Sequence, residues 1–512
     1  MNHPDLSTSD DGVAVAGKLD RGVLKVAAVV VLGSIMAILD TTVVNVALQE
    51  LTIQFRTSFD TIQWVATGYM LALAAVIPVT GWASDRFGTK RLYLVAISLF
   101  LVGSVLSGLA WSVETLIVFR LVQGLGGGML MPAGMTLLAR AAGPQRVGQV
   151  MALLGVPMLL GPIGGPILGG WLVDTVSWRW IFYINVPIGL LALWLTAIFL
   201  AKDEPEPTSR FDFAGMLMLS PGLALLLYGV ANVPGAASIS TTRVWLPVVL
   251  GATLVVGFLL RAARVSEPLI DLRLFRDRQF SVAVLTMAFF SVSFFGVMLL
   301  FPTYFLLVRG ESALQAGLLM APQGIGALIT MPLAGKLADK FGVGKVVLPG
   351  IGAIILGLAL FTTINADTPY WQLLAALFVI GLGVGAAMMP IMVAALQTLS
   401  HKDMAKGSTA TNIIQQMFGA IGSAVMSIIL ASVLAEKFGV PANEGQLAAT
   451  AALADPDSHR VAATAAAESF ATTFTWGLVL MVVCAIPAVL LPRRVTSVAD
   501  VESGTPLAMP TH

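Results

Sequence analysis

The sequence predicts an all-α membrane protein with fourteen transmembrane helices. Three observations support this prediction: the composition, the number of long apolar stretches, and the distribution of basic residues. The chain has 512 residues, of which 57% are hydrophobic and only 11% are charged, and its mean hydropathy is +0.89. Soluble domains contain about 45–50% apolar residues even when glycine is counted. The composition therefore excludes an ordinary soluble protein.

Fourteen apolar stretches approach or exceed the roughly 20 residues that a helix needs to cross a bilayer. They lie approximately at residues 25–48, 62–81, 92–111, 115–139, 147–172, 178–201, 214–233, 244–264, 279–308, 313–338, 345–364, 369–399, 406–435 and 469–492. Because this number of spans is even, both termini are expected on the same side of the membrane.

The basic residues are segregated by these spans. With the N-terminus placed in the cytoplasm, 22 of the 29 Lys and Arg residues fall in cytoplasmic segments, six fall in outer segments, and Arg120 lies within a span. This distribution follows the positive-inside rule. We therefore expect a multi-pass protein of the plasma (inner) membrane with two cytoplasmic tails, residues 1–24 and 493–512. No cleavable signal peptide is visible, and the first span is expected to act as an uncleaved signal.

Several classes of function find no support in the sequence. The single cysteine, Cys484, lies in the last span, and the four histidines lie in loops or tails, so neither a metal site nor a histidine proton relay is expected. No Walker-type phosphate loop is present, which excludes ATP as the direct energy source. No nucleophile–base pair indicates an enzyme or a catalytic residue, and no nucleic-acid partner is expected.

Two segments recur at long range within the chain. Gly81–Lys90 recurs as Gly335–Lys345, and Gly124–Pro132 recurs as Gly381–Pro390, at offsets of about 254–258 residues. Many transporters are built from duplicated halves with a substrate site between them. The repeat therefore predicts two homologous helix bundles.

The repeat also predicts the domain boundaries. Spans 1–6 form an N-terminal six-helix bundle at 25–201, and spans 9–14 form a C-terminal six-helix bundle at 279–492. Residues 202–278 hold two inserted transmembrane helices and their linkers. The linker at 266–279 alternates apolar and charged residues, which fits either an amphipathic surface helix or a solvated connector.

Two ionisable residues, Asp40 and Arg120, lie well inside the spans. A charge in hydrocarbon costs about 2.5–3.5 kcal/mol on insertion scales, so such residues usually have a function. Asp40 lies about eight residues from the outer end of its span and Arg120 about five residues from the outer end of its own. At about 1.5 Å per residue, their depths differ by about 4–5 Å. At similar depths the two residues can share one polar pocket if the fold brings the first and fourth spans together.

Together, Asp40 and Arg120 can work as a proton-coupling pair. Movement of Arg120, or arrival of a cationic substrate, would change the protonation of Asp40. Two alternatives stay open. Asp40 could be structural, with hydrogen bonds to Thr41, Thr42 or Asn45, and Arg120 could be a static polar anchor.

Five motifs occur in a characteristic order. They are Leu39–Leu48 in the first span, Gly81–Arg91 between the second and third, Arg120–Gly124 in the fourth, Gly161–Gly170 in the fifth, and Trp178–Gly189 at the sixth. Together they resemble the major facilitator superfamily, specifically its fourteen-span drug:proton antiporter branch of the EmrB/QacA type. This resemblance implies the major facilitator fold, with two six-helix bundles plus two inserted helices.

The resemblance also implies roles for individual residues. The loop between spans 2 and 3 would gate transport at the cytoplasmic side through Gly81, Asp85, Arg86, Gly88, Lys90 and Arg91. The antiporter motif would form a tightly packed face toward the second half and prevent leakage through Gly161, Gly165, Pro166, Gly169 and Gly170. This chain departs from the family pattern at Gln49, Thr89 and Gln415, which puts one cytoplasmic contact and a buried positive charge in doubt.

The implied function is proton-coupled antiport, exporting hydrophobic or amphipathic drugs by alternating access. The energy source would be the proton gradient, with no cofactor, and the EmrB type allows a periplasmic adaptor as a partner. Candidate substrate-binding residues are Asn45, Trp64, Tyr69, Gln123, Met129, Tyr304, Gln323, Asn412, Gln416 and Phe418. Each of these can also face lipid or neighbouring helices. The sequence leaves two other functions open: export of lipids or cell-envelope precursors, and a non-transporting membrane sensor or scaffold.

Overall fold

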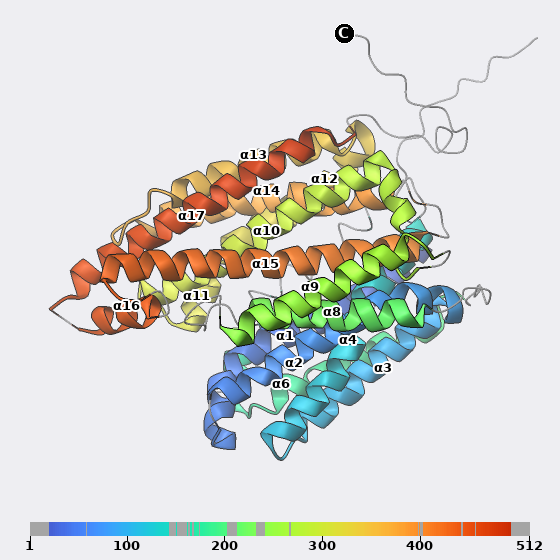
Figure 1. Ribbon diagram of the computed structural model, residues 1–512, viewed down its shortest axis with the longest axis horizontal. Helices are drawn as coiled ribbons and strands as arrows, with labels where there is room; N and C mark the ends of the chain where they lie inside the picture. Colours follow the sequence, from blue (N-terminus) through green and yellow to red (C-terminus); the bar gives the residue numbers. More distant parts are fainter. Residues whose placement is uncertain are drawn as a thin grey trace, which may run out of the picture.

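A computed structural model shows helices throughout the part of the chain that it describes and no strand within that part (Figure 1). The described residues are 20–57, 59–142, 150, 161, 164–165, 168–173, 175–201, 212–231, 241–265, 268–397, 399, 403–441, 444–455 and 457–492. Thirteen of the helical segments within these ranges are long and apolar enough to cross a membrane. The fourteenth expected span, 147–172, lies mostly outside the described residues.

The first bundle lies below the second in Figure 1 and is drawn in blue to cyan-green. Its helices are α1 (Arg21–Phe55), α2 (Phe59–Phe87), α3 (Thr89–Gly108), α4 (Val113–Ala142), α6 (Trp180–Tyr183) and α7 (Asn185–Phe199). The sixth span is thus a short helix followed by a longer one, with Ile184 between them. Helix α4 packs against α1, α2 and α3 and occupies the interior of the bundle.

The second bundle has the corresponding helices, drawn in yellow to red. They are α10 (Arg278–Leu307), α11 (Ala313–Leu319), α12 (Ala321–Phe341), α13 (Gly344–Phe361), α14 (Tyr370–Leu396), α15 (Met404–Phe438), α16 (Gly445–Ala454) and α17 (His459–Val489). Helix α14 takes the interior position here and packs against α10, α12 and α13. The additional helix α16 lies in the loop that joins α15 to α17.

Glycines let the repeated helices approach one another in the same way in both bundles. A Cβ placed on Gly128 would lie 2.5 Å from the carbonyl oxygen of Leu73, and one on Gly385 would lie 2.5 Å from that of Ala327. These contacts join α4 to α2 and α14 to α12. Small residues permit such close packing between membrane helices. The glycine-rich repeat detected in the sequence is therefore a repeated helix–helix contact.

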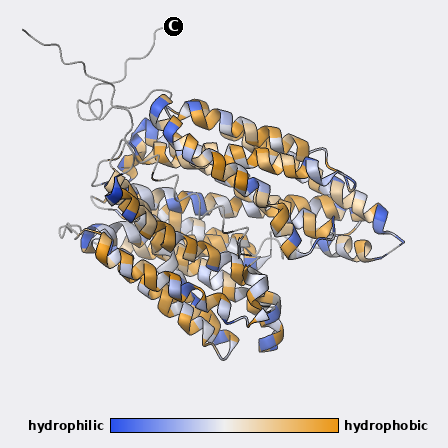
Figure 2. Cartoon of the chain, turned by 180° about the vertical axis from the view of Figure 1, so that it is seen from behind, coloured by the Kyte–Doolittle hydropathy of each residue, from blue (hydrophilic) through white to orange (hydrophobic). Residues whose placement is uncertain are grey.

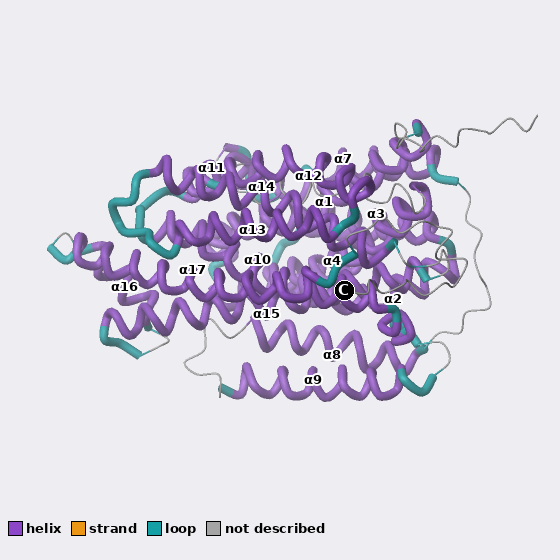
Figure 3. The backbone as a smooth tube through the Cα atoms, turned by 90° about the horizontal axis from the view of Figure 1, so that it is seen from above, coloured by secondary structure: helices purple, strands orange, loops and turns teal. Residues whose placement is uncertain are grey.

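The inserted helices α8 (Phe213–Ala231) and α9 (Thr242–Ala262) form a hairpin along one side of the molecule (Figure 3). Helix α8 packs against α2 of the first bundle and α15 of the second. Arg261 near the end of α9 forms an ion pair with the buried Asp212, which precedes α8, at 2.9 Å. The hairpin therefore covers the seam between the bundles on that side.

The linker before the second bundle differs from both expectations. It contains a 3₁₀ helix, η1 (Leu272–Arg276), which packs on α10. Leu269, Ile270 and Leu274 are at most 8% exposed. The described part of the linker is thus neither an amphipathic helix lying free on the surface nor a solvated connector, because its apolar side chains are buried in the protein.

Hydrophobic residues predominate along most of the helices, as the colouring of Figure 2 shows. Exposed examples occur on nearly every span, such as Val102, Trp194, Leu260 and Leu356, each more than half exposed. An exposed apolar belt of this kind is the surface expected of helices in contact with lipid. The protein is therefore a multi-pass membrane protein.

Candidate functional site

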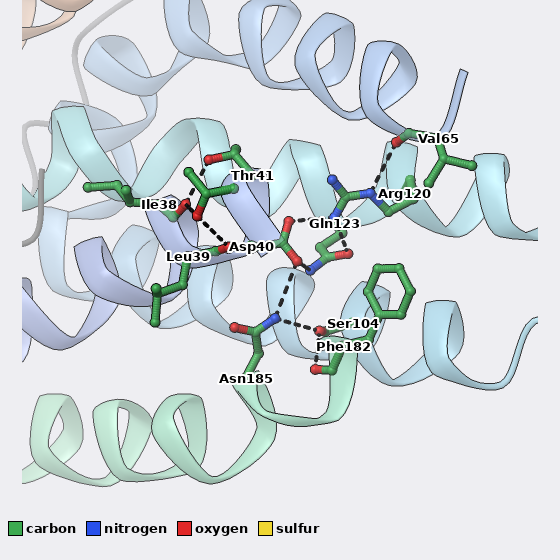
Figure 4. Close-up of polar contacts among 11 residues, drawn as sticks. Ile38, Leu39, Asp40, Thr41, Val65, Ser104, Arg120, Gln123, Phe182 and Asn185 are labelled. Carbon is green, nitrogen blue, oxygen red and sulfur yellow. Dashed lines mark hydrogen bonds and ion pairs between the residues drawn. The ribbon is translucent and has the colours of Figure 1, made fainter. Parts of the chain in front are cut away.

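The interior of the first bundle holds the two ionisable residues that the sequence singled out. Asp40 on α1 and Arg120 on α4 form an ion pair, and each residue is 1% exposed (Figure 4). The expectation that they share one pocket is confirmed by this contact. Helix α1 packs directly on α4, which brings the two side chains together.

Gln123, one turn along α4, contacts both members of the pair. Its Nε2 donates to Asp40 Oδ1 at 2.7 Å, and its Oε1 accepts from Arg120 Nη1 at 2.9 Å. Arg120 Nε also donates to the carbonyl oxygen of Val65 on α2 at 3.1 Å. A buried ion pair is stable only when such additional hydrogen bonds satisfy its remaining donors and acceptors. Gln123 is therefore part of the charged cluster.

Two aromatic rings cover the guanidinium group of Arg120. Its Cζ lies 4.1 Å from the ring centroid of Tyr69 and 5.8 Å from that of Phe182. Cation–π contacts of this kind are favourable, particularly when they are desolvated. Tyr69 is thus a neighbour of the ion pair, and its buried hydroxyl group has no hydrogen-bond partner in the structure.

The sequence analysis missed two members of this cluster, Asn185 and Ser104. Asn185 Nδ2 lies 3.3 Å from Asp40 Oδ1 and 3.1 Å from Ser104 Oγ. Ser104 Oγ in turn donates to the carbonyl oxygen of Phe182 at 2.8 Å. Asn185 belongs to the motif at the sixth span, but nothing in that motif indicated which helix its side chain faces.

The hydroxyl groups of Thr41 and Thr42, next to Asp40, donate hydrogen bonds to backbone carbonyl oxygens. Thr41 Oγ1 donates to the Ile38 carbonyl oxygen at 2.7 Å, and Thr42 Oγ1 donates to the Leu39 carbonyl oxygen at 3.0 Å. Both bonds stay within α1. The hydrogen-bond partners of Asp40 in the structure therefore come from α4 and α7 instead of its own helix. The side chain of Asn45 lies outside the described residues.

The antiporter motif of the fifth span is described only in part, and the described glycines lie against α1. A Cβ on Gly161 would collide with Ile38, one on Gly165 with Thr42, and one on Gly169 would lie 3.1 Å from the carbonyl oxygen of Val43. Pro166 lies outside the described residues, and a Cβ on Gly170 would meet nothing within 4 Å. This face was expected to pack toward the second half. The described glycines instead contact α1 on either side of Asp40.

The loop between α2 and α3 is a compact polar turn. Gly88 has a φ of 92°, a conformation that glycine adopts without strain. Asp85 pairs with Arg140 of α4 at 3.4 Å, and Arg140 also donates to Thr89 Oγ1 at 3.1 Å. Arg140 thus contacts both Asp85 and Thr89, the position at which the family motif usually has a basic residue.

Three basic residues complete this loop. Lys90 Nζ donates to the carbonyl oxygens of Ala197 and Leu200 at the end of α7, at 3.0 and 2.6 Å. Arg86 is half-buried at the end of α2, and Arg91 is exposed in the first turn of α3. The loop therefore joins the ends of α2, α3, α4 and α7.

The two bundles meet close to this loop, through the first third of α15. A Cβ on Gly81 would lie 3.0 Å from Thr409 Oγ1. Thr136 of α4 and Ser408 share a hydrogen bond at 2.9 Å, and Asn412 Nδ2 lies 3.0 Å from the sulfur of Met135. All three contacts cross from one bundle to the other. They close the seam at the end of the molecule that carries the α2–α3 loop.

The remaining substrate-binding candidates do not gather in one place. Trp64 stacks on Tyr228 of α8 with ring centroids 5.4 Å apart, so it faces the inserted hairpin. Tyr304 is buried in the second bundle, where its hydroxyl donates to the Asn365 carbonyl oxygen at 3.1 Å. Gln323 is buried there as well, with its Nε2 3.9 Å from the sulfur of Met298.

Three further candidates differ in their exposure. Met129 is 8% exposed, Gln416 is half-buried and Phe418 is 38% exposed. A pocket of about 210 Å³ lies at the junction of α13 and α14, around Asn365 and Gln372, and none of the candidates lines it. Within the described part of the chain, no three His, Cys, Asp or Glu side chains gather as a metal site requires.

Several known proteins are similar to this chain in sequence, and solved structures are similar to it in fold. A family model described as Major Facilitator Superfamily matches residues 30–425. A Mycobacterium tuberculosis (strain ATCC 25618 / H37Rv) protein called multidrug resistance protein B homolog is 42% identical over 496 residues, covering 94% of this chain and 92% of the relative. The multidrug export protein EmrB of Haemophilus influenzae is 30% identical over 402 residues, covering 78% of each chain.

Solved structures agree with this assignment at the level of the fold. The proton:xylose symporter XylE superposes with a TM-score of 0.56 at 15% identity, covering 94% of this chain and 98% of that one. The human organic anion transporter MFSD10 superposes with a TM-score of 0.57 at 15% identity. The family consists of membrane transporters and not of enzymes. This chain therefore belongs to the Major Facilitator Superfamily.

Proposed function

We propose that this protein is a proton-coupled antiporter that exports hydrophobic or amphipathic drugs by alternating access. The observation that carries the proposal is the buried ion pair between Asp40 and Arg120, set in a bundle whose other buried side chains are mostly apolar. Ionisable residues in membrane interiors commonly belong to proton relays or substrate pathways. The names of the relatives, which refer to multidrug resistance and export, support the drug class of substrate.

In this mechanism a proton competes with Arg120 for Asp40. Protonation neutralises the carboxylate and removes the ion pair. Arg120 still has the Gln123 amide oxygen, the Val65 carbonyl and the face of Tyr69 as partners, so the guanidinium group can stay charged in the interior. The ionic link between α1 and α4 is thereby lost, and only neutral groups remain to stabilise the charge of Arg120.

Helix α4 can transmit this change to the seam between the bundles. It carries Arg120 near one end and Thr136 sixteen residues later, about 24 Å along the helix. Gly124, Gly126 and Pro132 lie between them, so the intervening helix is closely packed and contains a bend-prone site. A shift of α4 after loss of the ion pair would therefore strain the contact between Thr136 and Ser408.

The remaining parts of the proposal follow from the charge distribution. We assign the α2–α3 loop and both termini to the cytoplasmic side, and the contacts between the bundles beside this loop support a state closed toward the cytoplasm. The protein resides in the plasma (inner) membrane, uses the proton gradient as its energy source and needs no cofactor. Its partners are protons, the lipid bilayer and small amphipathic substrates, and a periplasmic adaptor could extend the export route.

Dye efflux tests this proposal. Cells that express the wild type or Asp40→Asn are loaded with ethidium, and efflux is followed with and without an uncoupler. We expect efflux by the wild type, its loss on uncoupling, and efflux by Asp40→Asn no faster than in cells without the protein. Immunoblots of the membrane fraction check that both proteins are present in equal amounts.

Glu468→Gln is the matched control, because this carboxylate forms an exposed ion pair with Lys437 at 2.6 Å. The same change of carboxylate to amide at that exposed site should leave efflux intact. Uncoupler-sensitive efflux by Asp40→Asn at the wild-type rate would contradict coupling through Asp40. If the wild type moves no dye but transfers lipid between membranes, the substrate class is wrong and the lipid alternative replaces it.

A further inference from the structure

Asn185 lies where α6 meets α7 in the sixth span. Helix α6 ends at Tyr183 and α7 begins at Asn185, and Ile184 between them keeps helical backbone angles (φ −58°, ψ −27°). Asn185 is 0% exposed. Its amide nitrogen lies between two oxygen atoms, Asp40 Oδ1 at 3.3 Å and Ser104 Oγ at 3.1 Å. Figure 4 shows these side chains converging from α1, α3 and the α6–α7 junction. The junction therefore contacts the charged pair directly.

The hydrogen-bond network fixes which way the amide group points. Ser104 donates its hydroxyl hydrogen to the Phe182 carbonyl oxygen at 2.8 Å, so its oxygen is free only to accept from Asn185. Asp40 also presents an acceptor. Since both neighbours are acceptors, the amide must direct its NH₂ group toward them. The opposite orientation would place Asn185 Oδ1 against two oxygens.

The other end of the amide carries a cost in this orientation. Asn185 Oδ1 is buried and has no hydrogen-bond partner in the structure. A buried acceptor without a partner is unfavourable, so the contacts on the nitrogen side must outweigh this cost. The amide is therefore held as a donor by its surroundings, and Ser104 is the group that holds it.

We infer that Asn185 and Ser104 are positioning residues that hold the Asp40 carboxylate in its ionised form and connect its protonation to the sixth span. A hydrogen bond donated to a carboxylate stabilises the charged form. When Asp40 takes up a proton, Asn185 loses its charged acceptor, and the start of α7 loses a contact with α1. This inference rests on the proposed function of Asp40 as the proton carrier.

The groups facing Asp40 allow the contribution of the amide to be isolated. The charged or titratable ones among the described contacts are Arg120 from α4 and Tyr69 from α2, while α7 contributes the neutral Asn185. Arg120 stays protonated at all accessible pH values. Removing the amide therefore leaves the charge around Asp40 unchanged, and a change in its titration reports the lost hydrogen bond.

Infrared titration of the purified full-length protein measures this directly and needs no substrate. The carbonyl stretch of protonated Asp40 is identified as the band that Asp40→Asn lacks, and its intensity is followed against pH. In Asn185→Leu we expect the midpoint to move to higher pH, because a hydrogen bond donated to the carboxylate is lost. Ser104→Ala should move it in the same direction by less.

Two further variants separate positioning from general damage. Thr196→Val removes a buried hydroxyl from the same helix, α7, that bonds only to its own helix at Ala192, and should leave the midpoint unchanged. Ser104→Thr keeps the hydroxyl and should restore the wild-type midpoint. If Asn185→Leu does not purify as a monodisperse protein, Ser104→Ala and Ser104→Thr carry the comparison.

The outcomes distinguish this inference from the function on which it rests. An unchanged midpoint, or one at lower pH, in both Asn185→Leu and Ser104→Ala would overturn the positioning role while leaving Asp40 as the carrier. If no titrating band depends on Asp40, the proposed carrier is wrong and the inference fails with it. A midpoint raised equally by Thr196→Val would also overturn it, since the shift would then reflect disturbance of α7 in general.

Discussion

The two bundles share a packing plan but differ in what they bury. In the first, Gly124 of α4 lets the helix approach the backbone carbonyl of Tyr69 on α2. In the second, Gly381 of α14 approaches the backbone carbonyl of Gln323 on α12 in the same way. These pairs stand at equivalent positions of the repeat. The contact has been kept in both halves, although the side chains that it brings inward are different.

The difference is largest where the first bundle holds its charges. Arg120 aligns with Leu377, which is 0% exposed, and Tyr69 aligns with Gln323, which is 3% exposed. Gln323 has a buried amide oxygen without a partner, whereas Gln123 in the first bundle bonds to both members of the ion pair. Helix packing in this protein therefore does not require the buried charges. They have a local role in the first bundle, which agrees with a coupling function there.

The sharpest test makes the first bundle resemble the second. Arg120→Leu leaves Asp40 buried without its partner, and breaking a buried ion pair in this way costs about 3–5 kcal/mol. We expect loss of ethidium efflux and a clear drop in the thermal unfolding temperature of the purified protein, measured by scanning fluorimetry. The drop should be smaller at acid pH, because an orphaned carboxyl group can then take up a proton.

The double variant Asp40→Asn with Arg120→Leu separates stability from transport. With both charges removed, much of the thermal stability should return, since no uncompensated charge is left buried. Transport should stay absent. Efflux by the double variant at the wild-type rate would show that the first bundle, like the second, works without charges, and the functional contrast between the halves would disappear.

The buried glutamines give a second, smaller contrast. Gln123→Leu removes two hydrogen bonds to charged groups, each worth about 1.5–3 kcal/mol, and the buried apolar side chain of leucine offsets part of this loss. We therefore expect a net loss of about 2 kcal/mol and reduced efflux. Gln323→Leu removes an amide whose oxygen has no partner, and its effect on stability should lie near zero. Chemical unfolding of both variants measures the difference. Equal losses would mean that the amides contribute by packing and not through the charges.

How far the sequence predicts this site depends on which geometric quantity is needed. Depth along a helix can be read from the sequence, because each residue adds a fixed rise, and it places Asp40 and Arg120 at similar depths. That their two helices meet was implied by the family resemblance and is shown by the packing of α1 on α4. Which face of a helix packs against a neighbouring helix cannot be deduced from a single sequence. Trp64 was therefore expected in the substrate cavity but stacks on Tyr228 of the inserted hairpin.

The same reason explains the other differences in the site. Gln123 and Tyr69 were proposed as substrate contacts, yet both touch the ion pair. The glycines of the fifth span were expected to face the second half, yet Gly165 lies against Thr42 of α1. Asn185 was part of a recognised motif without an assigned partner. Helical periodicity gives the faces of each helix, but only packing decides which faces meet.

The smallest effect concerns the seam where the two bundles meet. Thr136 of the first bundle and Ser408 of the second share a buried hydrogen bond at 2.9 Å. In Thr136→Val this bond is lost, but Ser408 keeps its contacts with the carbonyl oxygens of Pro132 and Ala405 at 3.3 and 3.1 Å. The closed state should therefore lose only about 1 kcal/mol, which is about a fivefold change in the ratio of open to closed molecules.

Spin labels on the loops of the two halves can measure that ratio. Phe87 and Phe341 are equivalent positions in the repeat, are 49% and 44% exposed, and can be changed to cysteine after Cys484→Ala. We expect Thr136→Val to increase the population at long label distances about fivefold. Thr330→Val is the control, because Thr330 donates to the Leu382 carbonyl oxygen at 2.8 Å inside the second bundle. If both variants shift the distances equally, the hydroxyls act on packing in general; a shift in Thr136→Val alone means that the bond between the halves holds the seam closed.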